Sequence, residues 1–217
     1  MTYETFIFDL DGTLLDTLAD LAAAVNYALE KNGYPPRSLD EVQEFIGNGV
    51  VKLMERAIGQ PKENTVNFEQ TFLDFKRYYG ENCMVHTKLY DGIEEVLSAI
   101  KAKGKRCAIV SNKADFAVQI LNDFYFKGLI GVAVGENEGA GIRKKPAPDS
   151  VILALQLLGV EREGAVYIGD SEVDIQTAKN AGLPCISVSW GMKTREFLQS
   201  HGADTVLDEP LQLLQFV

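Results

Sequence analysis

The stretch TFIFDLDGTLLDT, residues 5–17, joins an apolar run to two aspartates and a glycine turn. Asp9 and Asp11 are two residues apart, and in an extended strand such residues point to the same side. Their carboxylates therefore compete for one small volume at the tip of the predicted strand. Since like charges at this spacing repel each other, the pair indicates a site that makes use of negative charge.

The rest of the chain repeats the pattern of the opening strand. Short apolar runs end in polar residues or glycine, which is typical of buried parallel strands. These runs are KRCAIVSN (105–112), LIGVAVGE (129–136), AVYIGD (165–170), PCISVSW (184–190) and ADTVLD (203–208). Helix-length stretches with apolar residues three and four apart separate them, at 92–104, 148–160 and 172–182. The alternation predicts an α/β fold with a doubly wound, mainly parallel sheet.

One interval interrupts this alternation, because after Asp9 the next strand pattern begins only at about Lys105. The stretches 17–33, 38–59 and 67–82 have only helical patterns, and the second opens with a Ser-x-x-Glu capping box. We therefore predict a small all-helical domain, residues 16–83, inserted into a sheet domain formed by residues 1–15 and 84–217.

The composition is that of a globular protein, with 217 residues, 46% hydrophobic and 24% charged. The formal net charge of −10 argues against sequence-independent binding to nucleic acid or to an acidic membrane surface. Cys83, Cys107 and Cys185 have no CxxC spacing and are expected to be reduced and inert. With no basic apolar leader and no run of about 18 apolar residues, we expect a cytoplasmic protein, either a monomer or a homodimer.

Chemically active residues gather at the predicted strand ends, where open α/β sheets bind their ligands. They are Asp9, Asp11, Gly12 and Thr13 after the first strand, Ser111, Asn112 and Lys113 after the second, Lys144 and Lys145 in the third crossover, and Asp170, Ser171 and Asp174 after the fourth. Three converging carboxylates would repel each other unless a cation held them, and Mg²⁺ suits such oxygen ligands. A lysine, a Ser/Asn pair and the backbone N–H groups of the Asp11-Gly12-Thr13 turn favour phosphate.

Four motifs also carry a family resemblance. DLDGT (9–13), SN (111–112), KPAP (145–148) and GDSEVD (169–174) resemble, in order and spacing, the four motifs of the haloacid dehalogenase superfamily. The helical insert with its Gly47-Asn48-Gly49 loop looks like that superfamily's cap, and residues 188–214 resemble the tail of its phosphoglycolate phosphatase-like branch. The resemblance spans the chain and implies a Rossmann-like core with an inserted helical cap domain.

The resemblance implies a role for each motif residue. Asp9 would be the nucleophile that forms an aspartyl-phosphate, and Asp11 would protonate the leaving oxygen and then activate water. Lys145 would neutralise charge on the phosphoryl group. Lys113 is a possible alternative by position, but the family places this role on the lysine before Pro146, with Lys144 as the fallback. Phosphate contacts are expected from Gly12, Thr13, Ser111, Asn112 and Lys145.

The implied cofactor is Mg²⁺, bound by the Asp9 side chain, the Asp11 carbonyl oxygen and Asp170, with Asp174 supporting the ligands from behind. In the cap, charge and position alone suggest that Lys52, with Arg56 one turn on, meets a second anionic group such as a carboxylate. Gly47 and Asn48, in the loop that resembles the family's cap loop, are also expected to contact the substrate.

The expected function is a Mg²⁺-dependent phosphatase of a small phosphorylated metabolite, with 2-phosphoglycolate as the leading candidate. A sugar-phosphate mutase of the β-phosphoglucomutase type uses the same aspartyl-phosphate, and a pyrophosphatase or sugar phosphatase of the same superfamily is a further alternative. A dehalogenase is disfavoured because its chemistry needs no second aspartate. A catalytically silent phosphometabolite-binding protein is disfavoured because the nucleophile, the acid and the metal aspartate are all present.

Overall fold

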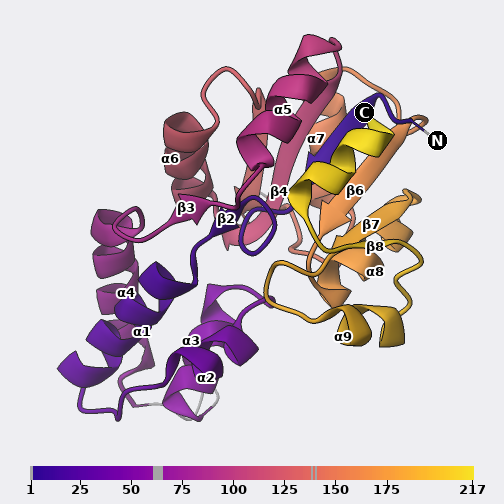
Figure 1. Cartoon of the computed structure of the whole chain (residues 1–217). Coiled ribbons are helices and arrows are strands. Elements are labelled where there is room, and N and C mark those ends of the chain that lie inside the picture. The colour runs from indigo at the N-terminus through magenta and orange to yellow at the C-terminus, as the bar shows by residue number, and fades with distance from the viewer. Residues whose placement is uncertain (1, 61–65, 138, 140) are drawn as a thin grey trace. The chain divides into compact units, whose positions relative to one another are not determined.

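The structure is a computed structural model that describes residues 2–60, 66–137, 139 and 141–217. Its contacts divide the chain into two compact units, and each is described by itself. The sheet unit comprises the chain up to Asp16 together with Leu89–Val217, and the helical unit comprises Thr17–Lys88. Figure 1 shows the elements of both units along the chain. This division falls after Asp16 and after Lys88, whereas the sequence patterns place it after residues 15 and 83.

The sheet unit is built on six parallel strands in the order β5-β4-β1-β6-β7-β8. Their bounds are β1 Thr5–Phe8, β4 Arg106–Ala114, β5 Val132–Glu136, β6 Ala165–Gly169, β7 Cys185–Val188 and β8 Val206–Leu207. From β1 the chain first winds outward through β4 and β5, and then returns to the other side of β1 with β6. The order therefore reverses between β1 and β6, which is where doubly wound sheets bind ligands. The predicted α/β fold is confirmed.

Helices cover both faces of this sheet. They are α5 Ile93–Ala102, α6 Asp115–Tyr125, α7 Asp149–Leu158, α8 Glu172–Ala181 and α9 Arg195–Ser200, followed by the 3-10 segment η3 Pro210–Phe216. Figure 1 shows α5 and η3 on the near side of the sheet and α7 on the far side. All four residues of β1 are buried, because a central strand covered on both faces has no solvent side.

In the core of the sheet unit, the strands pack against helices. Ile7 of β1, Val110 of β4 and Tyr167 of β6 share one buried cluster with Val151 and Ala154 of α7. Phe6 and Phe8 alternate with Ile7 along β1 and point to the opposite face, where they are also fully buried. Burial on both faces anchors β1, so that the residues after Phe8 start from a fixed point.

Strand β4 runs beyond its predicted end. The sequence pattern places Ser111, Asn112 and Lys113 at or after the end of this strand, but β4 continues to Ala114. Its register against β5 shifts between Val110 and Ala114. Such an irregularity bends the strand and redirects its side chains, which explains how polar residues with a catalytic pattern can lie inside a strand.

The helical unit contains α1 Leu18–Lys31, α2 Leu39–Phe45, α3 Val50–Ile58 and α4 Phe68–Asn82. The capping box predicted at the start of α2 is present, since Ser38 and Glu41 each bond to the other's backbone N–H. The pattern at 38–59 forms two helices rather than one. Gly47 (φ 117°) and Gly49 (φ 85°) adopt backbone angles that interrupt a helix and that only glycine reaches easily.

The chain leaves and re-enters the sheet unit through two short paired strands, β2 Leu15–Asp16 and β3 Lys88–Leu89. Just before β3, the backbone N–H groups of His86 and Thr87 donate to the buried carboxylate of Asp20 at 2.9 Å each. The Thr87 hydroxyl donates to the same group at 2.8 Å. These bonds hold His86 and Thr87, the segment that returns to the sheet unit, against α1. This return segment therefore belongs to the helical unit. Among the described residues, the helices are too short or too polar to cross a membrane.

Candidate active site

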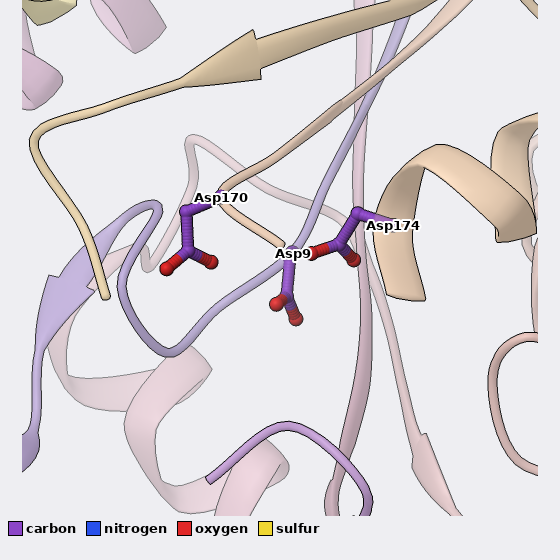
Figure 2. Close-up of side chains that lie close together, drawn as sticks. All are labelled: Asp9, Asp170 and Asp174. Carbon is purple, nitrogen blue, oxygen red and sulfur yellow. The ribbon is translucent and has the colours of Figure 1, made fainter. Parts of the chain in front are cut away.

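The site begins at the tip of β1, in the middle of the sheet. Phe8 pairs with Ile109 of β4 and Ile168 of β6, so the next residue, Asp9, lies between two neighbouring strand ends. The Asp9 backbone N–H donates to the Ile168 carbonyl at 2.8 Å, and its side chain is largely buried. Figure 2 shows the Asp9 carboxylate between those of Asp170 and Asp174.

The turn after Asp9 is closed by its own hydrogen bonds. The N–H of Gly12 donates to the Leu15 carbonyl at 2.9 Å, and the N–H of Thr13 donates to the Leu10 carbonyl at 3.3 Å. Both amides donate within the turn, and the expectation that Gly12 and Thr13 contact phosphate stays a prediction. Gly12 also provides a positive φ of 82° and leaves room for Asp170, with which a side chain at this position would overlap.

Lys145 lies against the nucleophile candidate. Its Nζ is 2.9 Å from Asp9 Oδ1 and 2.7 Å from Asp174 Oδ1, and it donates to the Tyr167 hydroxyl at 3.1 Å. Asn112 fixes the lysine backbone, since its Oδ1 accepts from Lys145 N at 2.7 Å and its Nδ2 donates to Lys145 O at 3.1 Å. Asn112, expected to contact phosphate, thus uses its amide to position Lys145.

Asp174 is fully buried and holds Lys145 from the start of α8. Its Oδ2 accepts from Ser171 Oγ at 2.6 Å and from Ser171 N at 3.2 Å, forming the cap of the helix. Its Oδ1 accepts from Tyr167 at 3.0 Å as well as from Lys145. A side chain at Gly169 would overlap Asp174, so the glycine makes this packing possible.

Asp11 forms an ion pair with a second lysine, Lys113. Lys113 Nζ lies 2.7 Å from Asp11 Oδ1, and the side chains are 2% and 14% exposed respectively. Ser111, also on β4, is buried, and its Oγ accepts from Lys113 N at 3.2 Å. An accepting hydroxyl keeps its O–H as a donor, which leaves Ser111 able to bind an anion.

Burial and crowding alter the proton affinity of these groups. Burial raises the pKa of Asp9 to about 7, with Lys145 opposing the rise and Asp174 adding to it. Burial, with the charges of Asp174 and Asp9, raises the pKa of Asp170 well above its usual range. Burial lowers the pKa of Lys145, but Asp174 and Asp9 outweigh this effect and the pKa rises. A nearby cation would favour the ionised carboxylates.

A divalent cation fits the donor set at this point. Asp9, Asp170 and Asp174 offer carboxylate oxygens within 4.8 Å of one another, the one such acidic group among the described residues. Asp9 Oδ1 is buried and, within the same part of the chain, accepts no well-directed hydrogen bond, although Lys145 lies close. Hard oxygen donors with spare lone pairs suit Mg²⁺. Since Asp174 already accepts four hydrogen bonds, Asp9 and Asp170 are the better ligands.

The predicted cap residues lie together on the loop before α3 and on its first turns, in the helical unit. Asn48 Oδ1 accepts from Arg56 Nη2 at 2.7 Å, and Arg56 Nη1 donates to the Phe45 carbonyl at 2.7 Å. Lys52 pairs with Glu55 at 2.6 Å and is 54% exposed. Asn48 and Arg56 therefore stabilise the loop that contains Gly47, whereas Lys52 pairs with Glu55 on its own helix.

Three residues make contacts that were not anticipated from the sequence. Tyr167 bonds to Lys145 and Asp174, and the signal for it is a lone phenol inside an otherwise apolar strand. Met192 donates to Asp170 Oδ2 through its backbone N–H at 2.6 Å, for which a sequence carries no side-chain signal. Trp190 donates through Nε1 to the Thr13 carbonyl at 3.0 Å.

The fold and site are those of a doubly wound α/β enzyme with an aspartate and a lysine at the centre of a parallel sheet. Residues 6–188 match the sequence profile of the haloacid dehalogenase-like hydrolases, and the chain belongs to this family. Within the family it is a phosphatase of the phosphoglycolate phosphatase-like branch. The resemblance inferred from the four motifs is confirmed.

Three known proteins illustrate the similarity. A phosphoglycolate phosphatase of Aquifex aeolicus is 34% identical over 213 residues, 97% of this chain and 95% of that protein. The solved structure of a provisionally named phosphoglycolate phosphatase from Lactobacillus delbrueckii subsp. bulgaricus has a TM-score of 0.91 at 39% identity, covering 98% and 97% of the two chains. A mutant of CbbY from Rhodobacter sphaeroides, solved with xylulose-(1,5)bisphosphate, has a TM-score of 0.74 at 26% identity, covering 98% and 96%.

Proposed function

We propose that this protein is a Mg²⁺-dependent phosphatase that hydrolyses 2-phosphoglycolate through an aspartyl-phosphate on Asp9. The observation that carries the proposal is the contact of the buried Asp9 carboxylate with Lys145 Nζ at 2.9 Å. A carboxylate becomes an effective nucleophile toward a phosphate dianion only where fixed positive charge offsets their repulsion. We place the reaction in the cytoplasm, carried out by a monomer or homodimer.

In the first half of the reaction, Asp9 attacks phosphorus and the bond from phosphorus to the glycolate oxygen breaks. Asp11 gives its proton to the departing oxygen, which would otherwise leave as an unstable alkoxide. Lys145 neutralises charge on the phosphoryl oxygens and Ser111 donates a hydrogen bond to one of them. Asn112 and Asp174 keep Lys145 in place.

In the second half, Asp11 takes a proton from water, and the water oxygen attacks the aspartyl-phosphate. Phosphate leaves and Asp9 is regenerated, so Asp11 ends each cycle protonated as it began. The Mg²⁺ ion, held by Asp9, the Asp11 carbonyl oxygen and Asp170, would supply positive charge for the phosphoryl oxygens. Asp174 would not bind the ion directly but would hold neighbouring groups, Lys145 and Ser171, in place.

Support for 2-phosphoglycolate comes from the relatives, since the Aquifex aeolicus protein that matches 97% of this chain is a phosphoglycolate phosphatase. A substrate with a phosphate and a carboxylate needs positive charge at both ends. We assign the carboxylate end to the loop of Gly47 and Asn48 and to Lys52, whose side chain is 54% exposed.

A sugar phosphate is the second candidate substrate. The observation that favours it is the likeness to CbbY, whose mutant was solved with xylulose-(1,5)bisphosphate. A sugar-phosphate mutase of the β-phosphoglucomutase type, or a pyrophosphatase, would use the same Asp9 chemistry. These alternatives differ from the main proposal in the leaving group and not in the phosphoryl site.

A phosphate-release screen separates the candidates. The purified protein is assayed with Mg²⁺ on 2-phosphoglycolate, xylulose-1,5-bisphosphate, β-glucose 1-phosphate and pyrophosphate, with Asp9→Asn as the matched inactive variant. We expect the highest kcat/KM on 2-phosphoglycolate. Lys52→Ala should lower kcat/KM on 2-phosphoglycolate, but not on phosphoesters whose leaving group has no charge. A higher value on a sugar phosphate would refute the assigned substrate, and conversion of glucose 1-phosphate without phosphate release would identify a mutase.

A further inference from the structure

The loop of residues 189–193, between β7 and α9, contacts the tips of two other strands. Met192 N donates to Asp170 Oδ2 at 2.6 Å, after β6. Trp190 Nε1 donates to the Thr13 carbonyl at 3.0 Å, after β1. Neither residue has a part in the proposed chemistry. The loop therefore ties together the two strand ends that provide the metal ligands.

Gly191 lies at the closest approach of this loop. A Cβ built on Gly191 would overlap the Gly12 carbonyl oxygen and would come within 2.5 Å of Asp170 Oδ2. The φ of Gly191 is outside the left-handed range, so a larger residue is excluded by lack of space and not by backbone strain. The glycine is what allows the loop backbone to press against Asp170 and the turn after Asp9.

The two oxygens of Asp170 have different surroundings as a result. Oδ2 accepts the short bond from the Met192 amide, whereas Oδ1 accepts a longer one, 3.3 Å, from Thr13 Oγ1. The side chain is 2% exposed, so a rotation would break the amide bond without gaining water. Asp170 is thereby fixed with Oδ1 as the less engaged oxygen.

We propose that the 189–193 loop is a positioning element for the cation, and that it presents Oδ1 of Asp170 as the single metal-binding oxygen of that residue. This rests on the proposed function, because it takes the cation to be Mg²⁺. Partners that orient a metal ligand commonly change metal affinity 10- to 100-fold when they are lost. The loop acts through Asp170 and does not itself touch the substrate.

The test measures Mg²⁺ binding to the full chain by calorimetry, with no substrate present. Gly191→Ala should raise the Kd for Mg²⁺ about tenfold or more, because the added methyl group displaces Asp170. Trp190→Phe removes the Nε1 donor but keeps an aromatic ring, and should raise the Kd about two- to fivefold. It serves as the second variant where Gly191→Ala does not fold.

The matched control is Gly131→Ala, also in the sheet unit, since no heavy atom of the described residues lies within 4 Å of a Cβ at this glycine. It should leave the Kd for Mg²⁺ unchanged. Unchanged Kd in both folded loop variants would overturn the inference. If the wild type binds no Mg²⁺, the proposed function itself fails at its metal requirement, whereas normal wild-type binding with unaffected loop variants refutes only the role of the loop.

Discussion

Two lysines serve two aspartates at the active site. Lys145 lies 2.9 Å from Asp9 Oδ1, and Lys113 lies 2.7 Å from Asp11 Oδ1. The pairs differ in their surroundings, because Asp9 also faces the buried Asp174, while Asp11 is partly exposed. Asp9 must be ionised to act as a nucleophile, and because burial raises its pKa, a nearby cation would help to keep it ionised.

The Lys113 pair leads to a prediction about the leaving group. Lys113→Met keeps the length of the side chain but removes the charge that orients Asp11. We expect the rate of phosphoryl transfer from 2-phosphoglycolate to Asp9 to fall about 10²-fold, because an alkoxide needs a well-placed proton donor. The same rate on p-nitrophenyl phosphate, whose phenolate leaves without a proton, should fall far less, whereas the later attack of water, which also uses Asp11, is common to both substrates. Rapid-quench measurement of this first step on both substrates measures the contrast.

Lys127→Met, at an exposed position of the same unit, is the control and should change neither rate. Equal losses in the rate of the first step on both substrates in Lys113→Met would contradict a role through proton donation by Asp11. They would indicate instead that Lys113 supports the phosphoryl site as a whole, and then the assignment of Lys145 as the phosphate lysine would need revision.

For single residues, the sequence predicts those whose side-chain type and position at a strand end indicate a chemical role. The structure brings Asp9, Lys145, Asp170 and Asp174 together, as the strand-end argument required. The sequence does not predict that the Met192 N–H donates to Asp170, because every residue but proline has a backbone N–H. Which amide points at Asp170 depends on the loop conformation, and a single sequence does not encode that in any one residue.

Among the elements, the anchoring of the return segment to α1 has a measurable cost. Asp20 is 3% exposed and accepts bonds from the backbone of His86 and Thr87. Asp20→Ala leaves both N–H groups without their acceptor, and an unsatisfied buried group costs about 1–3 kcal/mol. We expect the free energy of unfolding to fall by about 3 kcal/mol, measured by urea denaturation.

The control for this change is Asp123→Ala, which removes an exposed aspartate of α6 and should alter stability by less than about 0.5 kcal/mol. A similar small effect in Asp20→Ala would show that water replaces the lost acceptor. In that case the Asp20 carboxylate would not be what fixes the return segment.

Element types followed from the periodicity, whereas two element boundaries did not. The apolar pattern at 38–59 continues across Gly47 and Gly49, so it reads as one helix, but their positive φ angles divide it into α2 and α3. Strand β4 extends to Ala114 because a register shift accommodates its polar end. Both differences arise from local backbone geometry, to which hydrophobic spacing is insensitive.

For the whole molecule, the parallel sheet is what makes a site from distant segments. Asp9, Lys145 and Asp170 come from three parts of the sequence, and the strand order places the ends of β1 and β6 side by side. The same convergence concentrates negative charge in a buried space. A cation bound there would therefore contribute to the stability of the fold as well as to the proposed chemistry.

This charge gives a pH dependence with a definite sign. Without a cation, folding raises the pKa of Asp9 from 3.8 to about 7, so between these values the folded state holds a proton that the unfolded state has lost. The contribution of Asp9 to stability therefore falls as pH rises through this window. Because Mg²⁺ competes with that proton, it should raise Tm more at about pH 8 than at about pH 5.5.

Thermal unfolding with and without Mg²⁺ at the two pH values measures this effect. Asp9→Asn, which cannot ionise, should show a smaller Mg²⁺ effect, with only the pH dependence that Asp170 leaves. A Tm increase of equal size at both pH values in the wild type would mean that the cation does not bind the Asp9 carboxylate.

The central claim is that Asp9 carries the phosphoryl group, and one measurement tests it directly. Wild type and Asp9→Asn are mixed with phosphorus-labelled 2-phosphoglycolate and Mg²⁺, quenched in acid within milliseconds, and the precipitated protein is counted. We predict label on the wild type that hydroxylamine removes, as for an acyl phosphate, and none on Asp9→Asn. Rapid turnover by the wild type with no label on the protein, together with an active Asp9→Asn, would contradict the account.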